Sequence, residues 1–429
     1  MEVVIESSLI NTFLNQDPPP IVTKTNHIFV TLEDGIQYTD FTAGFTSHAI
    51  LGWTQPSVKK AIINQLEKFP HIDYKNFTDP NRIDLAKLLV SKAEHKLDKV
   101  FFVGASGSEA CEAALKISFQ NHYNNGYKNK KWFISREQSY HGSTSHAMAL
   151  GQRPNLEFFK PMFPNYVAKI SEHNEYRYKL VEETSDQYSK RSALELEKKI
   201  LELGSENVCG FVGETMLGGL VGDVPPSENY WKYISQICKK YDVHLIIDEV
   251  WCGTGSTGKI YCIDWDGVSP DIIFMGKTLG AGFLPLSCLV TSDAMLKPIK
   301  KGQGTILYSN TFQGHSTCIA AALAVQKIIH DDEFLEQVIE KGDLLRTVLF
   351  DELKDHVFFK NVRGRGLRNS IEYYCDDVHL FSLAIADEMK AKHNILISSK
   401  WHRTSFTPSL IVSKKEIEEV LECFINTFK

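Results

Sequence analysis

From about residue 98 onward, short apolar runs alternate with amphipathic stretches along the chain. Helical periodicity is clearest over Glu109–Tyr123 and Glu228–Tyr241. Strands that alternate with helices predict an α/β domain built on a largely parallel sheet. The apolar runs that we expect to form its strands are Lys99–Val103, Trp132–Ser135, Val208–Gly213, Val243–Val250, Asp271–Gly276 and Pro285–Thr291.

The two ends of the chain follow different patterns. Near the N-terminus, Ile28–Leu32 and Ile36–Tyr38 flank the turn residues Glu33–Gly35, which predicts a hairpin. Pro56 then opens an amphipathic helix. After about residue 315, long helical stretches surround short strands. We therefore predict an N-terminal segment (1–60) that contributes to a small domain, a large α/β domain (61–325) and a C-terminal small α+β domain (326–429).

The overall composition narrows the class of protein. With 43% hydrophobic and 23% charged residues, the chain of 429 residues is typical of globular proteins. A net charge of −6 gives no basic surplus, so we expect no nucleic-acid partner. Nine cysteines without any C-x-x-C spacing indicate reduced thiols and a cytoplasmic location. We find no signal peptide and no run of 18 apolar residues, so we expect no membrane partner.

Two polar residues interrupt neighbouring predicted strands. Lys277 follows one strand and precedes a loop of small residues, and Asp248 lies inside the strand before it. A lysine amine forms a Schiff base with an aldehyde when its surroundings lower its pKa. A buried carboxylate is costly without a partner, which is either another part of the chain or a cationic ligand. Pyridoxal phosphate fits this pair, because its ring nitrogen binds an anion and its aldehyde binds an amine.

Three further segments have both a ligand-binding and a purely structural interpretation. Ser106–Ala110 starts a predicted helix, where backbone N–H groups can bind a phosphate, but Ser106-x-x-Glu109 is also a capping box. Tyr140 follows a strand and can stack on a flat heterocycle or be an ordinary loop tyrosine. Thr311 can donate to a phosphate or belong to a plain turn.

Other motifs give weaker signals. Gly253–Gly258 matches G-x-G-x-x-G after a strand, but a dinucleotide site needs a helix to open at these glycines, and residues 259–270 have loop character. An NAD-dependent oxidoreductase is therefore the remotest interpretation. His71, His122, His141 and His146 show no spacing to carboxylates or thiols that is typical of a metal site, so we expect no metal.

Taken in order, these segments resemble the class III aminotransferases, which are pyridoxal-phosphate-dependent enzymes of fold type I. The resemblance covers about residue 28 to the end of the chain. It implies a large domain around a mostly parallel sheet, a smaller α+β domain, and ping-pong transfer of an amino group from an amine or amino acid to a 2-oxo acid. The matching segments are Ser106–Ala110, Tyr140–Gly142, Glu214–Gly219, Asp248–Val250, Gly276–Gly282, Asn310–Phe312, Arg363–Leu367 and Thr407–Leu410.

The resemblance also implies roles for individual residues at the cofactor. Lys277 forms the internal aldimine with pyridoxal 5'-phosphate and then moves a proton, while Asp248 pairs with the pyridine nitrogen. Tyr140 stacks on one ring face, Val250 packs on the other, and Glu214 lies beside the cofactor.

Phosphate and substrate contacts are implied in the same way. Gly107 and Ser108 bind the phosphate, and Thr311 reaches the phosphate of the neighbouring subunit, which implies a homodimer. Phe45, Thr46 and Ser47 match entry-loop positions of the family and shape the amine pocket. The carboxylate of the oxo acid requires a cation, for which Lys400 and Arg403 are the candidates and Arg365 is another option; Lys400 and Arg403 can equally be plain surface charges.

Four positions depart from the family pattern. Trp251 and Ser256 stand where the family often has glutamine and arginine, and Thr215 and Ser409 stand where it often has proline. We expect none of these changes to touch Lys277 or Asp248, so the cofactor chemistry should be kept, but they leave the substrate open. A decarboxylase, an aminomutase or a racemase with the same cofactor remains the alternative function.

Overall fold

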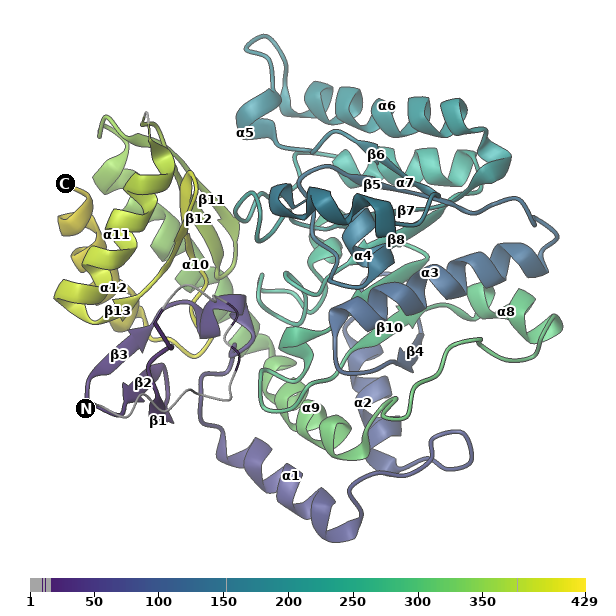
Figure 1. The fold of residues 1–429 in the computed structure, drawn as a ribbon, viewed down its shortest axis with the longest axis horizontal. Coiled ribbons are helices and arrows are strands. Elements are labelled where there is room, and N and C mark those ends of the chain that lie inside the picture. Colours follow the sequence, from purple (N-terminus) through teal and green to yellow (C-terminus); the bar gives the residue numbers. More distant parts are fainter. Residues whose placement is uncertain (1–9, 11, 13–16, 152, 376) are drawn as a thin grey trace, which may run out of the picture.

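The computed structural model describes residues 10, 12, 17–151, 153–375 and 377–429. The ribbon divides into two lobes (Figure 1). The larger one surrounds a seven-stranded sheet, and the smaller one combines the described N-terminal strands with the C-terminal part of the chain.

The large sheet has the strand order β4-β10-β9-β8-β7-β5-β6. Neighbours from β9 through β8, β7 and β5 to β6 are parallel, whereas β10 is antiparallel to both β9 and β4. This arrangement confirms the predicted, mostly parallel sheet. Its strands are β4 (Lys99–Phe102), β5 (Trp132–Arg136), β6 (Val167–Ile170), β7 (Val208–Glu214), β8 (His244–Asp248), β9 (Ile272–Met275) and β10 (Cys288–Thr291).

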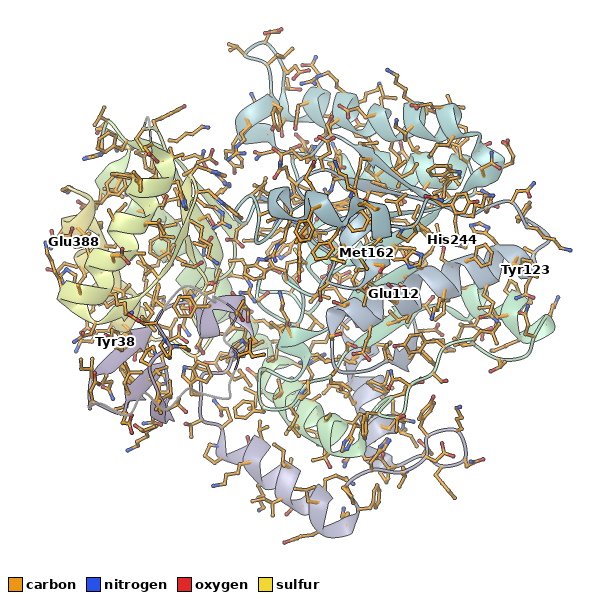
Figure 2. All side chains as sticks on the ribbon, viewed as in Figure 1. Tyr38, Glu112, Tyr123, Met162, His244 and Glu388 are labelled. Carbon is orange, nitrogen blue, oxygen red and sulfur yellow. The ribbon has the colours of Figure 1, made fainter. Side chains whose placement is uncertain are left out.

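Helices cover both faces of this sheet, which explains why its strands are continuously apolar. Along β8, Ile246 packs with α3 and α8, whereas Leu245 and Ile247 belong to the core on the other face. Figure 2 shows side chains filling both layers, with His244 of β8 inside the large lobe. The helices outside the small lobe are α1 (Pro56–Lys68), α2 (Pro80–Ser91), α3 (Gly107–Asn124), α4 (Ser145–Leu150), α5 (Glu175–Tyr178), α6 (Ser185–Leu203), α7 (Tyr230–Lys240), α8 (Asp293–Lys301) and α9 (Ser316–Ile329).

The small lobe contains two four-stranded sheets. One pairs β1 (Val22–Asn26), β2 (Phe29–Leu32), β3 (Gln37–Asp40) and β13 (Ile395–Leu396), so the N-terminal hairpin joins a strand near the other end of the chain. The other has the order β11 (Phe359–Arg365), β12 (Arg368–Tyr373), β15 (Arg403–Phe406) and β14 (Ser398–Lys400). Its helices are α10 (Asp332–Leu353), α11 (Val378–His393) and α12 (Lys414–Phe428).

Most predicted elements are confirmed. All six apolar runs contain a strand, the N-terminal hairpin forms, and the long helix α9 begins after residue 315 as predicted. Strand β6 was missed because Val-Ala-Lys-Ile is short and carries a lysine, whose amine is held by Leu150 O and Gly151 O. Among the described residues, no helix combines the length and the apolar character needed to cross a membrane.

The glycines of Gly253–Gly258 allow this loop to pack closely against two helices. These residues form turns, and the next helical segment begins only at Cys262. Gly255 has φ +87°, and a Cβ there would lie 2.4 Å from Ile329 Cγ2 of α9. A Cβ at Gly258 would lie 2.3 Å from Ile339 Cγ1 of α10. The geometry therefore does not support a dinucleotide site, and the motif reflects close contact between a loop and two helices.

Replacing Gly255 with alanine is expected to lower the free energy of unfolding by about 2–4 kcal/mol, because a strained backbone and overpacking act together. Gly267→Ala is the matched control, since Gly267 also has positive φ (+63°) but has no atom within 4 Å of the place that an added methyl group would occupy. Denaturant unfolding of both variants measures the difference. Equal losses would show that contact with α9 does not require glycine.

Candidate active site

A cavity of about 500 Å³ lies where the large sheet meets the small lobe. Its walls come from the carboxyl ends of β7 and β8, the start of α3, the loop after β9, and strands β14 and β15. Ligands of open parallel sheets bind at the carboxyl ends of the strands. This position makes the cavity the candidate active site.

Lys277 reaches this cavity from the loop after β9. Its φ of 37° lies in the left-handed region, which non-glycine residues adopt mainly in turns and at functional sites. Burial lowers the pKa of its amine to about 8; Asp248 opposes this effect, and the charge of Arg368 adds to it. The side chain also lies against Trp251, with Nζ 4.9 Å from the ring centroid, so the expectation that this departure from the family pattern does not touch Lys277 is wrong. The neutral, nucleophilic form of the amine is therefore accessible near neutral pH.

Asp248 ends β8 and is almost completely buried. Its Oδ2 is 2.8 Å from Nδ1 of His141, and its Oδ1 accepts a hydrogen bond of 2.9 Å from the Val250 amide. Burial lowers the pKa of His141 despite the neighbouring carboxylate, so we assign a neutral imidazole that donates from Nδ1. His141 thus fixes the orientation of Asp248. The sequence alone assigns His141 no role, because only the folded chain brings it to β8.

Glu214 lies beside Asp248 because β7 and β8 pair in parallel with these two residues in register. Burial, reinforced by the charge of Asp248, raises the pKa of Glu214 to about 8. Its Oε2 is buried without a hydrogen-bond partner among the described residues. Glu214 is therefore protonated near neutral pH and has a polar atom available at the cavity.

The start of α3 supplies anion-binding groups. Ser106 caps the helix in a capping box with Glu109, as one of the two interpretations predicted. The box does not use the N–H groups of Gly107 and Ser108, which belong to the first turn and have no partner within the helix. Both residues line the cavity. The positive end of an 18-residue helix therefore faces it, as a phosphate requires.

Close contacts shape the space between these groups. A Cβ at Gly107 would lie 2.8 Å from Val250 Cγ1, and one at Gly142 would lie 2.4 Å from Ser108 Oγ. Tyr140 and Val250 both line the cavity. The cavity thus combines an anion site, two side chains that can enclose a flat ring, a carboxylate and an amine. These groups fit a phosphorylated pyridine aldehyde.

The candidate substrate residues divide into two groups. Phe45, Thr46, Lys400 and Arg403 line the cavity. Ser47 instead points into the protein, where its hydroxyl bonds Thr407 Oγ1 at 2.9 Å. Arg365 is bound to Asp266, with Nη1 2.8 Å from Oδ2, and is not among the described residues that line the cavity. That option for the oxo-acid carboxylate is therefore wrong, because Arg365 already has a carboxylate partner.

Thr311 lies outside this cavity within one chain. It is exposed, and its carbonyl oxygen is 3.3 Å from Nε2 of His71. It borders a separate surface hollow with His71 and Tyr74. A contact between Thr311 and a cofactor would therefore have to involve the site of another subunit.

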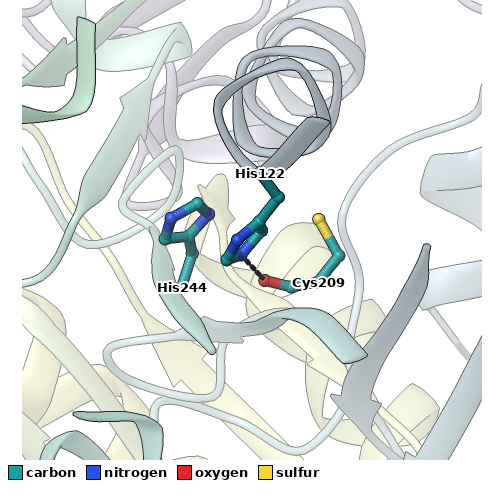
Figure 3. Close-up of side chains that lie close together, drawn as sticks. All are labelled: His122, Cys209 and His244. Carbon is teal, nitrogen blue, oxygen red and sulfur yellow. Dashed lines mark hydrogen bonds between the residues drawn. The ribbon is translucent and has the colours of Figure 1, made fainter. Parts of the chain in front are cut away.

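One of the histidines expected not to bind a metal has unexpected neighbours. His122, Cys209 and His244 lie close together at the opposite end of β8 from Asp248 (Figure 3). The two imidazole rings are stacked, with centroids 3.8 Å apart and planes 18° apart. Nitrogen lone pairs lie in the ring planes, so nearly parallel stacked rings cannot both point at one ion. His122 instead bonds Cys209 O at 3.0 Å, and His244 bonds Ser118 Oγ at 2.8 Å.

Comparison with known proteins agrees with this geometry. The family model of class III aminotransferases matches residues 14–428. An aminotransferase of Gibberella zeae is 34% identical, over 84% of this chain and 71% of its own. The diaminobutyrate–2-oxoglutarate transaminase of Halomonas elongata is 32% identical over 97% and 91% of the two chains. The omega transaminase of Pseudomonas jessenii, solved in complex with PMP, superposes with a TM-score of 0.90 at 28% identity and covers 96% and 92%.

Fold and site together define a pyridoxal-phosphate-dependent transferase of fold type I. The chain belongs to the class III aminotransferases, which transfer an amino group from an amine or amino acid to a 2-oxo acid. The resemblance seen in the sequence is thus confirmed for the family, the fold, the cofactor and the reaction.

Proposed function

We propose that Lys277 and Asp248 are the catalytic pair of this aminotransferase. The observation that carries the proposal is their convergence, from neighbouring strands, on one cavity in which burial lowers the pKa of Lys277 to about 8. The cofactor, when bound, supplies an electron sink for the bond-breaking step. Lys277 then takes up and returns the substrate proton at its Nζ.

The remaining residues hold and orient the reactants in this proposal. Asp248, held by His141, binds the protonated ring nitrogen, and Gly107 and Ser108 bind the phosphate. Tyr140 and Val250 enclose the ring. Glu214 carries a proton near neutral pH and donates it to a polar group of the cofactor or the substrate.

On the substrate side, we propose that Phe45 and Thr46 contact the amine and that Lys400 and Arg403 attract the oxo acid. Support comes from their positions on the cavity wall. A screen of amine donors against pyruvate and 2-oxoglutarate tests the reaction. Release of carbon dioxide, or isomerisation without any oxo acid, would instead identify a decarboxylase, aminomutase or racemase.

We also propose a homodimer in which Thr311 contacts the partner's cofactor. The exposed position of Thr311 outside its own cavity supports this arrangement, as does the exposed Phe312 beside it.

A mixing experiment tests this shared site. Lys277→Ala and Thr311→Ala are expected to be defective alone, yet dissociated and reassociated mixtures should regain activity. In a mixed dimer, one site would contain an intact Lys277 and an intact Thr311, contributed by different chains. If Thr311 acted within its own chain, both sites would stay damaged, and activity would not exceed that of Thr311→Ala alone. Light scattering gives the oligomeric state in parallel.

Two further predictions from the sequence, the domain boundaries and the location in the cell, stay proposals. We propose that the chain divides near residues 60 and 325, which is supported by the pairing of β3 with β13. A cytoplasmic location is supported by buried thiols at Cys111, Cys209, Cys238, Cys252, Cys262 and Cys288.

A further inference from the structure

Three cationic side chains lie in the walls of the active-site cavity, one from the segment after α4 and two from β14 and β15. They are Arg153, Lys400 and Arg403. None of the three forms an ion pair among the described residues. Asp248 keeps its negative charge, because the His141 that it bonds is neutral, but this charge acts on Lys277, and burial raises the pKa of Glu214 to about 8. The buried Asp223 acts on Arg403, which leaves Arg153 and Lys400 without a carboxylate within 4 Å among the described residues.

Arg153 is the cation best placed to bind a ligand. It lies in the segment after α4, and the carbon of its guanidinium lies 4.6 Å from the centroid of the Tyr140 ring. A guanidinium over an aromatic ring keeps its five N–H donors free for a planar acceptor. Its charge lowers the pKa of both Lys277 and Lys400, after the larger effect of burial, so its field extends to the reactive amine and to the opposite wall.

Arg403 differs from Arg153 because both of its Nη groups already donate hydrogen bonds. It is 2% exposed, its Nη1 and Nη2 groups donate to Ser405 Oγ and Gly219 O, and its buried Nε has no hydrogen-bond partner among the described residues. Arg403 is therefore a fixed charge in the wall, whereas Arg153 and Lys400 have donors available. Like charges that converge on a cavity are stabilised by an anionic ligand.

We propose that Arg153, with Lys400 as the second cation, binds a substrate carboxylate, so that the amine donor carries a carboxylate just as the oxo acid does. This inference rests on the proposed function for its amine chemistry. The proposal implies that the amino-group donors are amino acids and not uncharged amines. The carboxylate accepts two parallel hydrogen bonds from the Arg153 fork, and its charge offsets the repulsion among the three cations.

Binding of an unreactive ligand tests the site without turnover. Glutarate has two carboxylates and neither an amine nor a ketone, and glutaramide is its neutral counterpart of equal length. Isothermal titration calorimetry on the cofactor-loaded enzyme is expected to show binding of glutarate and little or none of glutaramide. Arg153→Gln should weaken glutarate binding by about 10- to 100-fold, since a bidentate charged contact is lost. Arg153→Lys should recover part of this loss.

Lys160→Gln is the matched control. Lys160 is an exposed cation of the same segment, pairs with Glu157 at 3.0 Å and is outside this cavity. Its replacement should leave glutarate binding unchanged. In steady-state assays, Arg153→Gln should raise KM for the oxo acid by the same factor as the dissociation constant of glutarate, while the visible spectrum should still show a lysine-linked cofactor.

Three results would overturn the proposal: no glutarate binding to the unmodified enzyme, equal binding of glutarate and glutaramide, or unchanged binding in Arg153→Gln. Failure of the aminotransferase function is a separate result. It would appear as absent turnover with every donor while glutarate still binds through Arg153. The carboxylate site would then be supported without the aminotransferase reaction.

Discussion

Lys277→Ala is expected to abolish turnover while the protein stays folded. Lys277 is proposed to be both the amine that binds the cofactor and the base that moves the substrate proton. Loss of both roles should reduce kcat by at least about 10⁴-fold. Stability should hardly change, because the replaced ammonium is buried at a cost and forms no ion pair within 4 Å among the described residues.

The measurements are single-turnover and steady-state rates, the visible spectrum of the bound cofactor, and thermal unfolding without cofactor. Lys169→Met is a matched control, since Lys169 is also partly buried and burial lowers its pKa to about 7. Its amine bonds Ser135 Oγ and Gly151 O outside the cavity, so its loss should lower stability and leave the lysine-linked cofactor spectrum intact. Undiminished turnover in Lys277→Ala would refute the mechanism.

Asp248→Asn is expected to cause the second-largest loss. It removes the negative charge that we propose stabilises a protonated pyridine nitrogen, while the amide keeps the shape of the side chain. Removing one partner of a buried ion pair costs about 3–5 kcal/mol, which corresponds to a loss of roughly a hundredfold to several thousandfold in kcat. Cofactor affinity should fall as well.

Asp271→Asn is the matched control. It separates the effect of losing the Asp248 charge from the effect of losing another carboxylate shielded from water. Asp271 lies at the opposite end of the adjacent strand, where its Oδ2 accepts the Leu245 amide at 2.7 Å, and burial raises its pKa to about 6. Its replacement should leave kcat unchanged. An Asp248→Asn variant with normal kcat and normal cofactor affinity would show that the ring nitrogen does not depend on this carboxylate.

Sequence reasoning succeeded where the relevant signal is local. Continuous apolar runs indicated buried strands, and polar residues at their ends, Asp248 and Lys277, indicated chemistry. The capping box at Ser106 was also readable from spacing alone. Such features depend on residues a few positions apart, which interact in any fold that contains the element.

Longer-range relations were not readable. The role of His141 was hidden because its bond to Asp248 joins residues 107 positions apart. Arg365 was a plausible carboxylate ligand until the fold placed Asp266 against it. The glycines from Gly253 to Gly258 matched a cofactor motif, whereas their actual constraint is contact with α9 and α10. Nothing in the sequence around Arg153 indicated ligand binding, since a single arginine after a short helix is common on protein surfaces.

The sequence by itself therefore determined the family, the α/β alternation and the two residues that we propose carry the chemistry, because these follow from local periodicity and from motifs along the chain. Only the tertiary structure decided which charges share a cavity, which are already neutralised and which remain available to a ligand. Burial and distance set both pKa values and ion pairing, and both arise only when remote segments pack together.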